Sequence, residues 1–311
     1  MDNANYHTSV MLAECMAGLE VKKGGTYVDL TFGGGGHSRE ILSRGGKVVG
    51  FDQDADAEAR GRELESEMGG MFRFVRGNFR FLVNYLKYAG IDKVDGVLAD
   101  LGVSGHQFDE GERGFSFRDE NAPVDMRMNR EQEKSAQEIL NEYDEEKLAT
   151  LLYIYGELKQ ARKMAKAIVA RRTGTDMQWT IGDLVETVKP MLDKGREKKD
   201  LAKVFQAIRI EVNGEMDALK EMLGQIPEVL KDEGRFVVMT YHSLEDRMVK
   251  NFVRTGNVEG REEKDFYGRT IAPMVAVNRK VIEPSDSEVA ENPRARSAKL
   301  RISKKVNNET E

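Results

Sequence analysis

Cysteine, proline, tryptophan and histidine are scarce in this chain of 311 residues. The single cysteine, Cys15, excludes an internal disulfide and favours a reducing compartment. No signal peptide is evident, and no apolar run approaches the ~18 residues that a membrane helix needs. Four scattered histidines do not form a metal-ligand cluster. We therefore expect a cytoplasmic protein with no membrane segment and no bound metal.

Basic residues are outnumbered by acidic ones, and the formal net charge is −6. This balance disfavours a protein that coats nucleic acid with its whole surface. Local basic surfaces remain open, because charges more than ~8 Å apart are largely screened at physiological salt. Two runs, 158–172 and 294–305, carry several Lys and Arg residues with no acidic residue. Each run is a solvated face, a contact for RNA phosphates, or a docking surface for acidic helices of the same chain.

Four consecutive glycines at 33–36 follow a strand pattern at 26–30, and a helix can begin directly after them. Strand, glycine turn and helix together open a Rossmann-like unit. Glycine suits this turn because a side chain would hold a ligand away from the backbone and disfavour positive φ angles. The next strand, 47–51, ends at Asp52, nineteen positions after Gly33. That spacing is typical of an acidic residue that binds a ribose hydroxyl pair.

The glycine loop fits two cofactors unequally. A dinucleotide fingerprint requires a third glycine where this chain has Ser38. A loop for S-adenosylmethionine reads acidic-x-x-x-G-x-G, which Asp29, Gly33 and Gly35 match in full. A pyrophosphate avoids a nearby carboxylate, whereas a methionine ammonium attracts one. The loop therefore favours S-adenosylmethionine, and the position of Asp52 argues against a turn that binds nothing.

Strand patterns alternate with amphipathic helices through the first hundred residues. The strands are expected at 26–30, 47–51, 72–76 and 94–100. Right-handed crossovers bring the carboxyl ends of such strands to one edge of a parallel sheet, where ligands bind. The glycine loop, Asp52, Phe79 and Asp100 should therefore converge. Phe79 either faces an adenine ring or packs in the core at the start of a helix.

The pattern becomes helical from about 135 to 212, with helices expected at 135–155, 158–172, 180–192 and 200–212. Strand patterns return at 235–241, 274–281 and 300–303, and Ser243 is a candidate helix cap. The sequence thus predicts an α/β fold with a doubly wound, mostly parallel Rossmann-like sheet, interrupted by an inserted all-helical domain. The expected boundaries are 1–104 and 213–311 for the two parts of the α/β domain and 105–212 for the helical domain.

Eight short segments lie in order along nearly the whole chain: YH at 6–7, TFGGGGHS at 31–38, DLGVS at 100–104, RGFSF at 113–117, DMRM at 125–128, FQAIRI at 205–210, HSLEDR at 242–247 and ENPRARS at 291–297. With them the chain resembles the bacterial 16S ribosomal RNA cytosine-N4 methyltransferases, the MraW family. The resemblance implies a class I, S-adenosylmethionine-dependent enzyme that methylates the exocyclic N4 amine of one cytosine in the decoding centre. It also implies 16S ribosomal RNA, within the small ribosomal subunit, as the partner, and substrate recognition by the helical domain.

Carried over by position, the resemblance implies a set of cofactor contacts, to which the loop pattern adds Gly33. The other members are Gly35, Gly36, His37, Asp52, Phe79, Asp100 and Gln107. His37 would lie in the loop, Asp52 at the ribose and Phe79 beside the adenine.

Asp100 is also the candidate catalytic residue. Other amino-methyltransferases have Asp or Asn followed by Pro-Pro-aromatic at this strand end, where the present chain continues Leu-Gly-Val. The acceptor of the amine proton is therefore either the Asp100 carboxylate or a backbone carbonyl just after it. The target base must leave its stack, and Phe115, Phe117 or Tyr241 could hold its ring.

Two other functions are consistent with the same fold. One is a nicotinamide-dependent oxidoreductase, and the other is a non-catalytic RNA-binding or assembly module. The cofactor that raises the melting temperature, and the transfer of labelled methyl groups to ribosomal RNA, would separate the three. The sequence leaves open the exact nucleotide, the assembly stage of the substrate and the oligomeric state, for which a homodimer is one candidate.

Overall fold

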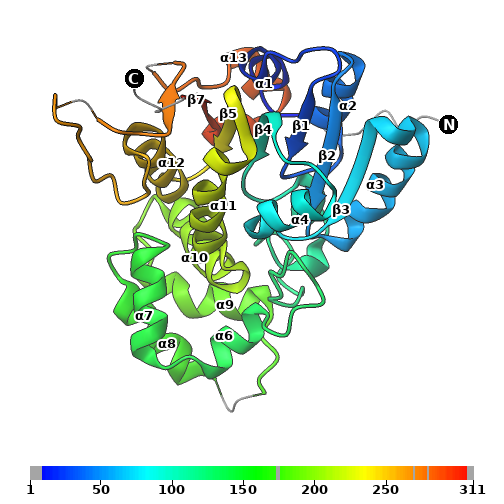
Figure 1. The fold of residues 1–311 in the computed structure, drawn as a ribbon. Helices are drawn as coiled ribbons and strands as arrows, with labels where there is room; N and C mark the ends of the chain where they lie inside the picture. The colour runs from blue at the N-terminus through cyan, green and yellow to red at the C-terminus, as the bar shows by residue number, and fades with distance from the viewer. Residues whose placement is uncertain (1–8, 173–175, 269, 279, 307–311) are drawn as a thin grey trace. The chain divides into compact units, whose positions relative to one another are not determined.

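The computed structural model describes residues 9–172, 176–268, 270–278 and 280–306 (Figure 1). The Tyr6–His7 pair of the sequence analysis lies outside the described residues. The chain divides into two compact units. The α/β unit consists of Met1–Gly102 and Met216–Glu311, and the helical unit is Val103–Glu215.

The α/β unit is built on a seven-stranded sheet in the order β3-β2-β1-β4-β5-β7-β6, as far as the chain is described. Its parallel strands are β1 (Thr26–Asp29), β2 (Lys47–Asp52), β3 (Phe72–Arg76), β4 (Val94–Asp100) and β5 (Leu230–Thr240). Strand β7 (Lys299–Lys305) pairs antiparallel to β5, and β6 (Met274–Ala276) pairs antiparallel to β7. The expected mostly parallel α/β sheet is thereby confirmed.

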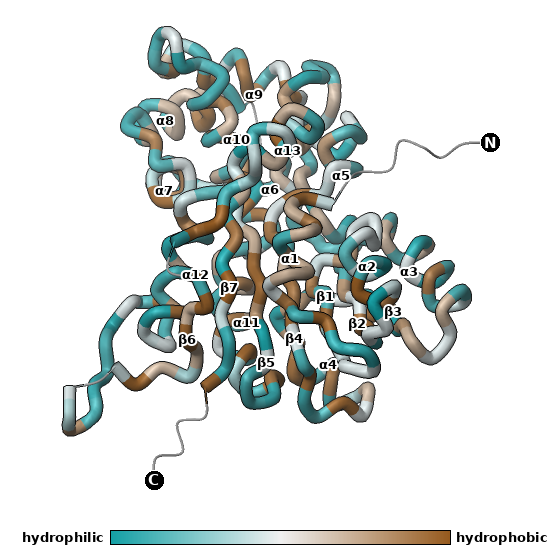
Figure 2. The backbone as a smooth tube through the Cα atoms, turned by 90° about the horizontal axis from the view of Figure 1, so that it is seen from above, coloured by the Kyte–Doolittle hydropathy of each residue, from teal (hydrophilic) through white to brown (hydrophobic). Residues whose placement is uncertain are grey.

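Helices cover both faces of this sheet because its central strands are apolar on both sides. Leu98 of β4 packs in one core, and its neighbours Val97 and Ala99 pack in the other. The Leu98 face is covered by α1 (Leu12–Leu19), α2 (Gly36–Ser43) and α3 (Ala55–Met68). The opposite face is covered by α4 (Leu82–Tyr88), α11 (Glu215–Val229) and α12 (Ser243–Thr255), and a short α13 (Asp286–Glu291) precedes β7. Figure 2 shows the hydrophobic residues along the strands in the middle of the sheet.

The helical unit has a core of its own. Its helices are α5 (Gly105–Asp109), α6 (Ala136–Glu142), α7 (Glu145–Ile154), α8 (Ala161–Arg171), α9 (Ile181–Val188) and α10 (Glu197–Asn213). Trp179 is fully buried there, and its indole N–H donates a 2.8 Å hydrogen bond to Asn141. In the described part of this unit, β structure is limited to one isolated bridge between Pro123 and Thr180.

Several predicted element boundaries were wrong, and local hydrogen bonds explain why. The helix expected over 135–155 breaks at Tyr143, because Asp144 caps a new helix by accepting from the Lys147 N–H. The cap of α12 is His242 rather than Ser243, with Glu245 completing a capping box. The strand expected over 274–281 ends at Ala276. Among the described residues, no helix combines the length and the apolar character needed to cross a membrane.

Candidate active site

Three aspartates end adjacent strands of the sheet: Asp52 on β2, Asp29 on β1 and Asp100 on β4. Asp29 is buried, and the other two are partly buried. Burial raises the pKa of Asp29, and it raises the pKa of both Asp52 and Asp100 to about 6. The negative charge of Asp29 adds to the rise at both neighbours. Because desolvated carboxylates repel one another, this edge of the sheet favours a cationic ligand.

The glycine loop between β1 and α2 is closely packed. Gly33 and Gly35 have φ angles of 51° and 79°, in the left-handed region that favours glycine. A Cβ at Gly35 would lie 2.7 Å from the ring of Phe32, and one at Gly36 would lie 2.1 Å from the hydroxyl of Ser9. Helix α2 begins at Gly36, one residue before the predicted start, without a side-chain cap. The N–H groups of its first turn are therefore suited to an anionic group of a ligand.

Asp29 and Asp52 hold this loop through hydrogen bonds. The Asp29 carboxylate accepts from the Ser38 hydroxyl at 2.7 Å and from the Thr31 N–H at 3.2 Å. The Asp52 carboxylate accepts from the Gly33 N–H at 2.8 Å and from the Asp54 N–H at 2.9 Å. The strand-end carboxylates thus fix the loop conformation as well as the local charge.

His37 is buried at the start of α2. Its Nε2 lies 3.1 Å from the carbonyl oxygen of Val10, in the segment that leads into α1. The positive form of its imidazole would lower the pKa of Asp29 and of Asp100. His37 therefore connects the glycine loop to the N-terminal segment, and its direct contact with a cofactor stays a prediction.

Asp100 is held from both sides along the sheet edge. Its backbone N–H donates to the Thr31 hydroxyl at 2.7 Å. Its Oδ1 accepts a 2.6 Å hydrogen bond from the hydroxyl of Tyr241, which directly follows β5. From the sequence, Tyr241 was a candidate for holding the target ring, and its hydrogen bond to Asp100 was not predicted. Because β4 and β5 are parallel neighbours, Asp100 and Tyr241 lie at the same edge of the sheet. Knowledge of the strand order would therefore have indicated that the two side chains are close.

Phe79 and Gln107 have structural roles that compete with their predicted ones. Phe79 opens a short 3₁₀ turn and packs, partly buried, against the core that contains Val97. Gln107 belongs to the helical unit, where its side-chain oxygen accepts from the Ser104 N–H in a capping box. Both residues remain predicted cofactor contacts.

Two of the three aromatic residues considered for the target base belong to the helical unit, Phe115 in its core and Phe117 partly buried against that core. Phe115 is buried, and the ring of Phe117 packs edge-on against Phe205 with centroids 5.6 Å apart. Burial leaves little of the Phe115 ring for stacking on a base, and the role of Phe117 stays a prediction. Tyr241 alone of these three belongs to the α/β unit, beside Asp100.

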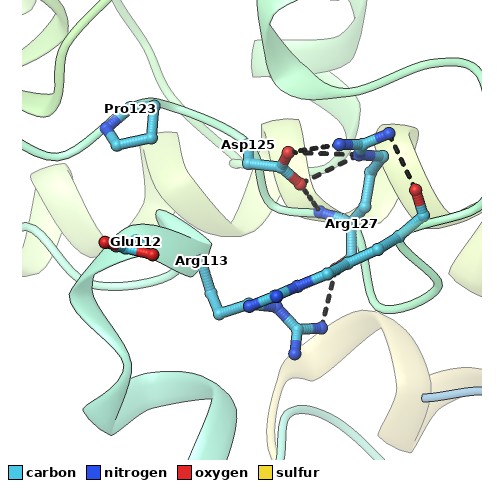
Figure 3. A pocket seen from close by; sticks show the side chains of 6 residues that line it. Glu112, Arg113, Pro123, Asp125 and Arg127 are labelled. Atoms are coloured by element: carbon cyan, nitrogen blue, oxygen red, sulfur yellow. Dashed lines mark hydrogen bonds and ion pairs between the residues drawn. The ribbon is translucent and has the colours of Figure 1, made fainter. Parts of the chain in front are cut away.

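A cavity of about 380 Å³ opens in the helical unit beside the RGFSF and DMRM segments (Figure 3). It is lined by Glu112, Arg113, Pro123, Asp125, Arg127 and Arg130. Arg127 forms a bidentate pair with Asp125 at 2.6–3.1 Å and also donates to two loop carbonyls. The buried Arg113 donates to the carbonyls of Arg127 and Met128. These two guanidinium groups thus hold the loop together, which gives the arginines of both segments a structural role.

The two basic runs differ in how their charges are used. In the C-terminal run, Lys299 and Arg301 pair with Asp246, and Lys304 and Lys305 lie beside acidic residues among the first residues of β5, Glu233 and Asp232. Attraction to the chain's own carboxylates explains these four cations without RNA. On α8, Arg171 pairs with Asp183 and Glu186, and Arg172, directly after the helix, donates to three backbone carbonyls. The exposed cations of α8 are Arg162, Lys163 and Lys166.

Comparisons with known proteins agree along nearly the whole chain. The model of the MraW methylase family matches residues 4–306. Ribosomal RNA small subunit methyltransferase H of Bacteroides thetaiotaomicron is 56% identical over 307 residues, which cover 98% of this chain and 99% of that protein. The proteins of the same name from Phocaeicola vulgatus and Porphyromonas gingivalis are 55% and 52% identical. They cover 96% and 97% of this chain, and 97% of their own length in each case.

Proposed function

This chain belongs to the MraW methylase family, as its motifs predicted, and we propose that it methylates the N4 amine of a cytosine in the decoding centre of 16S ribosomal RNA. It is a methyltransferase that uses S-adenosylmethionine, so the nicotinamide-dependent alternative is set aside. The observation that carries the proposed substrate is the identity of 50% or more with relatives named for the small-subunit RNA, over nearly full length. We expect the reaction to take place in the cytoplasm.

The residues at the sheet edge fit this cofactor. Its sulfonium and ammonium groups are cationic, which matches three carboxylates whose pKa values are raised by burial. The glycine loop has no side chains that would hold the cofactor away from its backbone, and the packing at Gly35 and Gly36 has no room for any. The start of α2 has no side-chain cap, so its free N–H groups suit the methionine carboxylate. We propose that the cofactor contacts are Gly33, Gly35, Gly36, His37, Asp52, Phe79, Asp100 and Gln107.

When bound, S-adenosylmethionine supplies an electrophilic methyl group. The cytosine amine is a weak nucleophile because its lone pair is delocalised into the ring, so the protein must orient its N–H bonds and take a proton. Asp100 is suited to both tasks, since a carboxyl with a pKa of about 6 is mostly ionised at pH 7 and still basic. General-base catalysis contributes ~10²–10⁴-fold, whereas alignment of bound reactants can supply up to ~7–11 kcal/mol. We therefore expect orientation to contribute more than proton removal.

Substrate recognition is assigned, in this proposal, to the inserted helical domain, residues 105–212. The exposed cations of α8 support it, because Lys and Arg on one helix can neutralise phosphates of a folded RNA. The small ribosomal subunit is the form of the substrate that we propose. For the oligomeric state, a homodimer is a candidate that size measurements in solution would decide.

The test is methyl transfer from labelled S-adenosylmethionine to small subunits isolated from cells that lack this enzyme. We expect one methyl group per subunit, mapped by mass spectrometry to the N4 atom of a decoding-centre cytosine. Asp100→Asn, which keeps the size of the side chain and removes its charge, serves as the control and should transfer methyl groups more slowly. Transfer to another atom, or to the large-subunit RNA instead, would contradict the proposed substrate.

A further inference from the structure

Tyr241 touches the proposed proton acceptor directly. Its hydroxyl donates to Oδ1 of Asp100 at 2.6 Å, and Met239, two residues earlier on β5, pairs in register with Asp100. No described residue donates a hydrogen bond to Oδ2 of the same carboxylate. The two oxygens of Asp100 are therefore inequivalent before any substrate binds.

Tyr241 is held through both its backbone and its ring. The Tyr241 backbone N–H donates at 2.9 Å to Glu245, a buried carboxylate in the capping box of α12. On the other side, the ring lies 3.4 Å from the position that a Cβ would take at Gly102. Gly102 has a φ angle of 102°, where glycine is favoured. The chain turn after β4 is thus shaped around the tyrosine that contacts Asp100.

We propose that Tyr241 is a positioning residue for methyl transfer: its hydroxyl occupies Oδ1 of Asp100 and leaves Oδ2 to accept the N–H of the target amine. The inference rests on the proposed function, because it assigns a partner to the proposed acceptor. A hydrogen bond to a carboxylate also favours the ionised form, which is the form that can take a proton. Tyr241 therefore controls both the orientation and the charge of Asp100.

Other groups around Asp100 act on the same charge from different elements. Burial and the nearby carboxylates raise its pKa, and the imidazole and the phenol oppose them. The groups are Asp29 on β1, Cys15 on α1, His37 on α2, Glu245 on α12 and Tyr241 after β5. Loss of the phenol hydroxyl should therefore move the pKa of Asp100 above its value of about 6.

The test is Tyr241→Phe, which keeps the ring against Gly102 and removes only the hydroxyl. Single-turnover methyl transfer to small subunits is measured at saturating cofactor between pH 5 and 9. The acid limb of the rate profile should shift to higher pH by about one to two units, the equivalent of one hydrogen bond to a charged acceptor. The deficit should be roughly tenfold near pH 6 and shrink toward pH 9.

Tyr27→Phe is the matched control. Tyr27 is buried, and its hydroxyl accepts a 2.7 Å hydrogen bond from the Lys22 N–H near the start of β1, away from the sheet edge that carries Asp100. This variant should lose thermal stability and keep the wild-type pH profile. If Tyr241→Phe also lost only stability, with its acid limb unmoved, Tyr241 would be a packing residue and the inference would be overturned.

A second measurement separates this inference from the proposed function. The Asp100 carboxyl is titrated by ¹³C NMR in the wild type and in Tyr241→Phe, with Asp100→Asn to assign the signal. A midpoint that rises in the variant supports control by Tyr241, and an unchanged midpoint overturns it even where the enzyme is active. If the wild type transferred no methyl group to ribosomal RNA, the proposed function would fall, and with it the role of Asp100 as acceptor.

Discussion

Asp52 combines two tasks, because the carboxylate proposed to bind the ribose also accepts the N–H groups of Gly33 and Asp54. We predict that Asp52→Ala weakens S-adenosylmethionine binding by about 10- to 150-fold, the equivalent of a hydrogen bond to a charged acceptor worth roughly 1.5–3 kcal/mol. Isothermal titration calorimetry measures the affinity.

The control for Asp52 is Asp54→Ala. Asp54 caps α3 by accepting from the Asp56 N–H, so its loss should lower stability without removing a ribose contact. An Asp52→Ala variant that binds the cofactor as tightly as the wild type would show that the ribose lies elsewhere.

Asp100 should cost the free protein stability at neutral pH. Its folded-state pKa of about 6 lies above the unfolded value near 3.9, so the folded state binds more protons between these values. Proton binding to Asp100 stabilises the folded state fully below about pH 4, and this stabilisation is lost as the pH rises through 6. Without cofactor, Asp100→Asn should therefore raise the free energy of unfolding by up to about 2–3 kcal/mol at pH 8, with little change at pH 4.

Urea unfolding at the two pH values checks this sign. Asp95→Asn is an informative comparison, because the pKa of Asp95 is shifted in the opposite direction. Burial raises this pKa, but the ion pair with Lys231 and the hydrogen bond from the Thr26 N–H together lower it by more. Asp95→Asn should destabilise the protein at pH 8. Equal effects of Asp100→Asn at pH 4 and pH 8 would contradict the raised pKa.

Among the elements, the glycine loop offers a matched pair of positions. Gly35 and Gly24 both have φ angles of 79°, but a Cβ at Gly24 meets nothing within 4 Å, whereas one at Gly35 meets the Phe32 ring. Gly24→Ala should cost about 1–2 kcal/mol of stability from backbone strain alone. Gly35→Ala should cost more and weaken cofactor binding at least tenfold, because the loop must move. Thermal unfolding and calorimetry test both, and equal effects of the two changes would contradict the packing argument.

The exposed cations of α8 permit a test of RNA contact. Replacing Arg162, Lys163 and Lys166 by alanine should weaken RNA binding and reduce the slope of log affinity against log salt by about 2, at ~0.7 per lost phosphate contact. Cofactor affinity should not change. The control is Lys304→Ala with Lys305→Ala, whose charges lie near Glu233 and Asp232. A salt slope unaltered by the α8 changes would mean that this face is only solvated.

The strands and the glycine loop were predictable because their signals are local. Apolar runs, glycines and terminal acids each lie within a few residues, so Asp52 and Asp100 were found at strand ends before any strand order was known. Contacts between distant segments were not predictable in this way. The Tyr241–Asp100 hydrogen bond joins residues 141 positions apart, and the Arg301–Asp246 pair joins residues 55 apart. For the same reason, the sequence did not show that four cations of the C-terminal run, Lys299, Arg301, Lys304 and Lys305, have acidic partners within the chain.

At the scale of the whole molecule, the helical unit is continuous in sequence from Val103 to Glu215 and has its own buried core. We predict that this fragment folds in isolation, with a cooperative thermal transition by circular dichroism. Trp179 provides a second probe, because its buried indole should become solvent-exposed in the same transition. A fragment that is helical but melts without cooperativity would show that its core needs the rest of the chain.

The place of the insertion also sets the order in which the sheet can be completed during synthesis. Strand β4 ends at Asp100, and its partner β5 begins 130 residues later, at Leu230 (230 − 100). At a synthesis rate of about 5–20 residues per second, the edge of β4 that pairs with β5 stays unpaired for roughly 7 to 26 seconds on the ribosome. An unpaired apolar strand edge invites pairing with other chains. The helical unit, which is continuous in sequence, has time to fold during this interval, so we expect the pairing of β5 with β4 to come late and to be sensitive to aggregation.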